Sequence, residues 1–105
     1  MKLCYSVATP EVARMPVAWV GGHERALARL ADIGYSGVEL QTRDPAAFDR
    51  AGFLAKVRAS GLEVVGVSTG PAASDDGLFL TAVDPIVRAA ALTRMRDIVD
   101  FAAEC

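Results

Sequence analysis

Polar side chains stand near the ends of two apolar, strand-like segments. Glu39 and Gln41 belong to segment 36–41, and Ser68 ends segment 62–68. Their carboxylate, amide and hydroxyl groups can hydrogen-bond a polyol, and a carboxylate whose pKa is raised by burial can act as a general base. The alternatives are a solvated Glu39 paired with Arg43, and loop-capping roles for the other two. We select Glu39, Gln41 and Ser68 as candidate substrate-binding residues and assign no catalytic residue.

The remaining residues with reactive or ligating side chains are isolated in the sequence. His23 is the only histidine, and we expect it to be exposed or to cap a helix. Cys4 and Cys105 have no second Cys or His at metal-binding spacing, and Cys4 is expected to be a small buried residue. Trp19 either covers the mouth of a sugar site or simply packs. These residues predict neither a metal site nor a nucleophile.

Three strands and three helices alternate along the chain and must position the candidate site. Strands are predicted at 2–8, 36–41 and 62–68, and helices at 22–33, 45–60 and 85–105, with polar loops at 9–21 and 69–83. Gly34 and Gly61 end two helices, while Asp44-Pro45 and Asp84-Pro85 begin two others. Arg94 is interpreted as part of a solvated outer face. The alternating order predicts an α/β fold with a parallel sheet in one domain, 1–105.

The alternation of side chains sorts the strands into two faces. One face is expected to be bulky and to contact helices, and the other to be small or polar. A doubly wound sheet needs two apolar faces, whereas a barrel needs one, so the pattern favours a partial (β/α)8 barrel over an open flavodoxin-like sheet. The predicted bulky face consists of Leu3, Tyr5, Val7, Val38, Leu40, Val65 and Val67, and the other of Cys4, Ser6, Ala8, Gly37, Glu39, Gln41, Val64, Gly66 and Ser68.

Composition and charge limit the classes of partner that this protein is expected to bind. The net charge is -2 and the basic residues are scattered, so a nucleic-acid partner is not expected. No apolar run approaches the roughly 20 residues that cross a bilayer, and no signal peptide is visible. We therefore expect a cytoplasmic protein with no membrane partner.

Three segments together resemble a known family. Segment 31–40 (ADIGYSGVEL) is similar to a helix-to-strand junction of the xylose-isomerase-like barrel superfamily, which includes sugar phosphate isomerases and epimerases. Segment 61–68 (GLEVVGVS) resembles the third strand of that superfamily, and segment 84–91 (DPIVRAAA) resembles the entry to its third helix. The resemblance extends over nearly the whole chain in the right order. It implies the first three units of a TIM (β/α)8 barrel.

The resemblance also implies a function. The family includes isomerases and epimerases that use a divalent metal (Mn, Mg or Zn), and the ligands lie on later strands that this chain does not contain. The chain would then supply part of the wall that binds a sugar or sugar phosphate. Three units leave sheet edges open, so a homo-oligomer or a separate chain that completes the barrel is also expected. The alternatives are a non-catalytic oligomerising or interaction module and a flavodoxin-like small-ligand domain.

Overall fold

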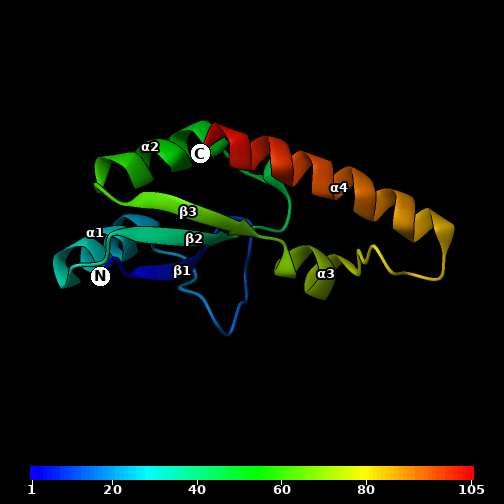
Figure 1. Ribbon diagram of the computed structural model, residues 1–105, viewed down its shortest axis with the longest axis horizontal. Helices are drawn as coiled ribbons and strands as arrows, with labels where there is room; N and C mark the ends of the chain where they lie inside the picture. Colours follow the sequence, from blue (N-terminus) through cyan, green and yellow to red (C-terminus); the bar gives the residue numbers. More distant parts are fainter.

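The computed structural model describes all residues, 1–105, as a three-stranded sheet with helices packed against it (Figure 1). The elements follow in the order β1 (Cys4–Ala8), α1 (His23–Ile33), β2 (Gly37–Gln41), a 3-10 turn η1 (Pro45–Ala47), α2 (Arg50–Ala59), β3 (Glu63–Ser68), α3 (Gly70–Asp76) and α4 (Pro85–Glu104).

The sheet is parallel throughout, and its strand order is β1-β2-β3. The three strands lie within the three ranges that the sequence predicts as strands. Because every strand points the same way, the carboxyl ends of all three lie at one edge of the sheet, where the polar residues were expected to gather. The α/β class with a parallel sheet is therefore correct.

Two helical segments differ from the sequence prediction. The range 45–60 is divided, because Phe48 is extended and Asp49 begins a new helix by accepting a hydrogen bond from the backbone N–H of Gly52. The range 69–83, predicted as a loop, contains the short helix α3, which has Pro71 in its first turn and is stopped by Gly77 in the left-handed conformation (φ 66°). Seven residues are too few for a periodic apolar pattern to be visible in the sequence.

The helices α1, α2 and α4 all cover the same face of the sheet. Their buried side chains form one core with the β1 and β2 residues on that face. The flavodoxin-like alternative requires helices on both faces, and this arrangement does not provide them. None of the helices is both long and apolar enough to span a bilayer. The core consists of Val7, Leu27, Leu30, Val38, Leu40, Phe53, Leu54, Val57, Leu62 and Phe101.

A β-bulge in β3 corrects the predicted faces of that strand. Val38 pairs with Val64, but the next residue, Glu39, pairs with Gly66, so Val65 is the extra residue. Val64 therefore packs against the core with the helices, and Val65 is 56% exposed. A Cβ built on Gly37 would come within 2.7 Å of the Val65 side chain, which places Val65 on the helix-free face. The assignment of Val64 and Val65 from strict alternation is wrong because a bulge breaks the two-residue period.

The edge strand β1 is more exposed than the sequence suggests. Leu3 and Tyr5 were expected to rest under helices, but they are 47% and 40% exposed, and Cys4 is exposed rather than buried. Beside the second half of β1, Trp19 forms a parallel bridge with Val7 and exchanges backbone hydrogen bonds with the neighbouring strand residues. The loop after β1 thus covers half of that edge, while β3 has no strand on its outer side.

Candidate functional site

The carboxylate of Glu39 is the centre of a polar cluster on the helix-free face of the sheet. Ser6 Oγ donates to Glu39 Oε2 and Ser68 Oγ donates to Glu39 Oε1, each at 2.6 Å. The register explains this contact, because Ser6 is the β1 partner of Glu39, and Ser68 is two positions beyond its β3 partner Gly66. Three neighbouring strands therefore bring one carboxylate and two hydroxyl groups together.

Gln41 completes the cluster. Its side-chain Nε2 donates to Glu39 Oε2 at 3.1 Å, and the residue is buried. The selected residues Glu39, Gln41 and Ser68 thus lie in one hydrogen-bonded group at the carboxyl edge of the sheet. Ser6 also belongs to the cluster but is not among the candidate residues selected from the sequence. Its place on the same face as Glu39, and its pairing with Glu39, follow from the parallel order of β1 and β2.

Hydrogen bonding decides the charge state of Glu39. The hydroxyl of Ser6, followed by that of Ser68, lowers the pKa of Glu39, and the Gln41 amide acts in the same direction against the opposing effect of partial burial. A hydrogen bond donated to a carboxylate stabilises its ionised form. The condition for general-base chemistry, a pKa raised by burial, is therefore not met. An ionised Glu39 is suited to accept hydrogen bonds.

The predicted alternative partner of Glu39 belongs to a different network. The Arg43 side chain pairs with Asp76 on α3 at 3.0 Å instead of with Glu39. Arg94 of α4 pairs with the same Asp76 at 2.8 Å and with Asp44 at 3.2 Å. Arg94 is only 19% exposed, so its assignment to a solvated outer face is wrong. This network ties α3 and α4 to the loop after β2, next to the candidate site.

Burial and the neighbouring arginines shift the pKa of Asp76 in opposite directions. Burial, the largest single influence, would raise the pKa of Asp76, but Arg94 and Arg43 together lower it through hydrogen bonds and charge attraction. The carboxylate is therefore ionised and holds both guanidinium groups. Its role is to fix the segments that flank the sheet edge.

Glu11 supports the same edge from the loop after β1. Its Oε1 accepts hydrogen bonds from the Thr9 hydroxyl and from the backbone N–H groups of Arg43 and Asp44. Its Oε2 is buried and has no partner within the protein. Thus a carboxylate of the first loop holds the second loop in place, a contact between residues more than 30 positions apart that no local sequence pattern indicates.

His23 and Trp19 act as structural residues. The ring Nε2 of His23 donates to the carbonyl of Ala8 at 2.7 Å, and the ring contacts Phe53 edge-on. His23 is partly buried, so the expectation of an exposed or capping residue is wrong. Trp19 packs against the core, which supports the packing alternative for this residue.

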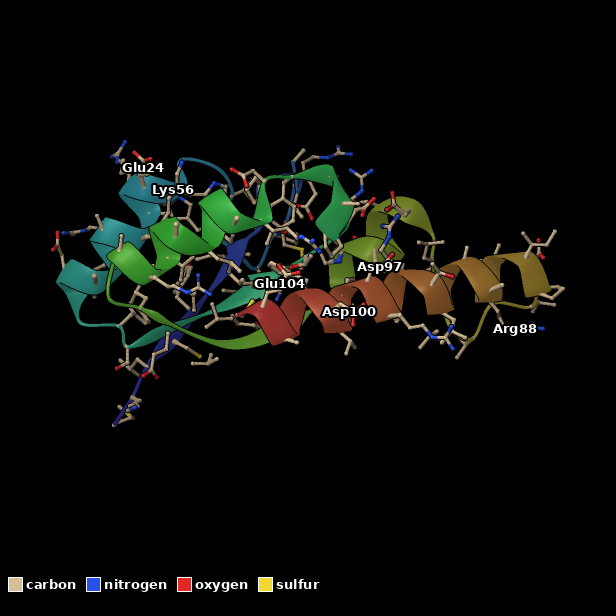
Figure 2. The ribbon with its side chains drawn as sticks, turned by 90° about the horizontal axis from the view of Figure 1, so that it is seen from above. Glu24, Lys56, Arg88, Asp97, Asp100 and Glu104 are labelled. Carbon is tan, nitrogen blue, oxygen red and sulfur yellow. The ribbon has the colours of Figure 1, made fainter.

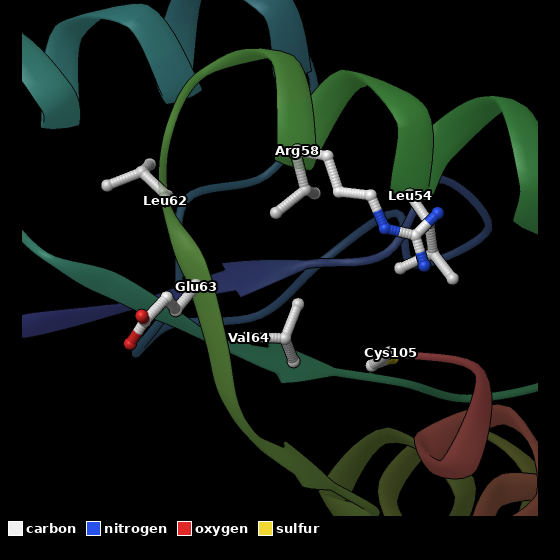
Figure 3. A pocket seen from close by; sticks show the side chains of 7 residues that line it. Leu54, Arg58, Leu62, Glu63, Val64 and Cys105 are labelled. Atoms are coloured by element: carbon white, nitrogen blue, oxygen red, sulfur yellow. The ribbon is translucent and has the colours of Figure 1, made fainter.

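A separate cavity lies at the opposite end of the sheet. It has a volume of about 370 Å³ and opens between α2, the start of β3 and the end of α4 (Figure 3). Its lining is mainly aliphatic, and the polar cluster around Glu39 is not part of it. The lining residues are Leu54, Val57, Arg58, Leu62, Glu63, Val64 and Cys105.

The residues present do not assemble a divalent-metal site. No group of three or more His, Cys, Asp or Glu side chains converges anywhere in the protein. At the polar cluster there is one carboxylate, and each of its oxygens already accepts a hydroxyl hydrogen bond. The metal that the resemblance implies is therefore not assigned to residues of this chain.

Comparison with known proteins adds no assignment. A scan against protein-family models found no match, and a search of curated proteins found no matching sequence. The polar cluster around Glu39 and the sequence resemblance are therefore the features that bear on function.

Proposed function

We propose that this chain forms the first three units of a (β/α)8 barrel of the sugar phosphate isomerase and epimerase type. The observation that carries the proposal is the Glu39 carboxylate held between Ser6 and Ser68 at the carboxyl edge of a parallel sheet. Barrel enzymes build their active sites at this edge. The single helix-covered face and the strand order β1-β2-β3 also support the barrel.

In this proposal the chain binds the sugar or sugar phosphate and does not perform the proton transfer. An ionised Glu39 accepts hydrogen bonds from two adjacent substrate hydroxyls, replacing the hydroxyls of Ser6 and Ser68. The freed serine hydroxyls and the Gln41 amide can then donate to substrate oxygens. A fixed set of acceptors and donors orients the polyol, which is how binding groups assist a reaction at a neighbouring centre.

The metal (Mn, Mg or Zn) and the residues that move the proton belong to later units of the barrel in this proposal. A bound divalent metal would polarise the substrate oxygens next to the proton that is removed. The partner is then either a chain that completes the barrel or further copies of this one, and the location is the cytoplasm.

The experiment is a titration of the 15N-labelled chain with sugar phosphates, followed by NMR. We expect saturable shifts at the backbone amides of Ser6, Glu39 and Ser68, and their loss in Glu39→Gln. Glu63→Gln is the matched control, because it removes an exposed carboxylate at the other end of the sheet, where the only salt-bridge partner is Lys2. Equal shifts in both variants, or no saturable shift in the wild type, would contradict the binding role.

A second candidate function is a non-catalytic interaction module. The observation in its favour is the outer side of β3, which has no neighbouring strand. An unpaired edge can pair with another chain, although the bulge at Val65 makes this edge less regular. Isomerase assays of the purified chain with added Mn or Mg, in parallel with the titration, separate the two functions. Sugar binding without turnover supports the barrel-wall proposal, and absence of both supports the module.

A further inference from the structure

The cavity at the amino end of β3 has walls that polar contacts hold in place. Arg50 of α2 pairs with Glu104 of α4 at 3.2 Å. The guanidinium of Arg58, also on α2, donates to the Glu104 carbonyl at 2.9 Å. The end of α4 is thus tied to α2, and the cavity of about 370 Å³ that they border with β3 is already formed in the free chain. This volume falls within the range of sites that hold small molecules.

Most of the cavity lining is aliphatic. Leu54, Val57 and Leu62 are buried core residues whose side chains also line the cavity. Val64 adds a branched side chain from β3. Burial raises the pKa of the Cys105 thiol, so this side chain is uncharged at neutral pH and acts as a further small apolar group. The lining therefore fits a hydrocarbon chain.

Arg58 brings a positive charge to this apolar space. It forms no ion pair within the chain and donates to one backbone carbonyl, so most of its five N–H donors are free. In Figure 3 its guanidinium points toward the space between Leu54 and Cys105. Glu63, the carboxylate in the lining, pairs with Lys2 instead, at 3.8 Å. An unpaired guanidinium beside an aliphatic lining favours a ligand that is both anionic and apolar.

We propose that this cavity binds a small aliphatic carboxylate, with the carboxylate on Arg58 and the hydrocarbon chain against the aliphatic lining. A guanidinium matches a carboxylate through two parallel N–H···O bonds, which fix the orientation of the ligand. A primary alcohol of the same length lacks the charge and uses only the apolar lining. The cavity lies at the opposite end of the sheet from Glu39, so this inference does not rest on the sugar-binding role.

Alkylation of the wild-type chain by iodoacetamide, followed for each cysteine by mass spectrometry, tests occupancy with hexanoate as the probe. We expect hexanoate to slow the alkylation of Cys105 severalfold in a saturable manner, because Cys105 lines the cavity. Cys4 is the internal control, since it is exposed on β1 and its rate should not change. An unchanged rate at Cys105, or equal slowing of both cysteines, overturns the proposal. A Cys105 rate that falls with rising protein concentration alone would show that a second copy covers the cavity, and would also overturn it.

An NMR titration of the 15N-labelled chain with hexanoate and with hexan-1-ol tests the role of Arg58. We expect hexanoate to bind about tenfold more tightly than the alcohol, and Arg58→Met to abolish this preference. Binding of hexan-1-ol to Arg58→Met at wild-type strength shows that the cavity is intact in the variant. Equal binding of the two probes by the wild type, or a preference that persists in Arg58→Met, would contradict the proposal.

Lys56→Met is the matched control for Arg58→Met. It removes a cation from the same helix, but on the flank that faces α1, where Lys56 pairs with Glu24 at 3.1 Å. Figure 2 shows these two residues together, on the other side of α2 from Glu104. We expect Lys56→Met to keep the wild-type preference for hexanoate. Loss of the preference in both variants would show that general positive charge, and not Arg58, attracts the carboxylate.

Discussion

Glu39 is ionised and held in a fixed orientation, the two properties that the proposed sugar-binding role requires. Both come from hydrogen bonds that neighbouring strands donate to it, with Ser6 and Ser68 each at 2.6 Å. Such charge-assisted bonds are among the stronger hydrogen bonds in proteins. In the proposed role, substrate hydroxyls would replace the two serine hydroxyls at the carboxylate oxygens.

The lowered pKa of Glu39 makes folding stability depend on pH. The folded-state pKa lies below that of the unfolded chain, so the contribution is fully present above the ordinary Glu pKa and is lost as the pH falls through the folded value. We expect Glu39→Gln to cost about 1 kcal/mol at neutral pH and less in acid, because the charge-assisted bonds are already lost there. Urea unfolding from neutral pH down to pH about 3, where most carboxylates become protonated, measures the difference.

Glu63→Gln is the control for that comparison, because its carboxylate is exposed and lies at the opposite end of the sheet. The free energy of unfolding of Glu63→Gln should vary with pH in the same way as that of the wild type. A difference between wild type and Glu39→Gln that stays constant over the whole pH range would contradict the proposed charge state.

At the scale of the elements, the bulge in β3 positions the site. By inserting Val65, it moves Gly66 opposite Glu39 and brings Ser68 onto the helix-free face. The extra side chain needs space, and Gly37 on β2 provides it. A Cβ at Gly37 would lie 2.7 Å from the Val65 side chain and 2.8 Å from the carbonyl oxygen of Glu63. Position 37 in β2 therefore needs a glycine, because the bulged strand β3 leaves no room for a Cβ there.

Replacement of Gly37 tests whether this position needs a glycine because a Cβ would clash, or because glycine has a more flexible backbone. We expect Gly37→Ala to lower the free energy of unfolding by about 1–3 kcal/mol through overpacking against backbone. Gly66→Ala is the matched control on the same face, since its Cβ would come no closer than 4.0 Å to Glu39. Its effect should be small. Chemical denaturation of both variants is the measurement, and equal effects would show that the contact around Gly37 does not matter.

At the scale of the whole molecule, charged side chains attach the outer helices to the sheet. Arg94 reaches from α4 to Asp76 on α3, and to Asp44 and the Arg43 carbonyl after β2. The N-terminal half of α4 extends past the strands at this end (Figure 1). The network holds the loops that border the candidate site.

Removal of Arg94 should loosen this end of the molecule. We expect Arg94→Met to cost about 1–3 kcal/mol, since Asp44 and Asp76 lose a partly buried partner. Arg29→Met, on the exposed side of α1, should be nearly neutral. Hydrogen exchange of α3 and of the first half of α4 should increase in Arg94→Met while the strands remain protected. Unchanged exchange in α3 would contradict the anchoring role of Arg94.

The order and type of the main elements could be predicted from the sequence, because short-range signals determine them. Asp-Pro pairs, helix-ending glycines and the apolar strands indicated the α/β order, the parallel sheet and the edge at which Glu39, Gln41 and Ser68 gather. These signals operate within a few residues, so they are visible in a single sequence.

The contacts between distant residues were decided only by the tertiary structure. The bulge at Val65, the burial of Arg94 and the bond of His23 to the Ala8 carbonyl depend on which atoms other segments bring near. The lowered pKa of Glu39 likewise could not be predicted from the sequence, because it depends on two hydroxyls that other strands place against the carboxylate. The local sequence indicates which secondary structure a residue favours. The neighbours of its side chain depend on how the whole chain packs.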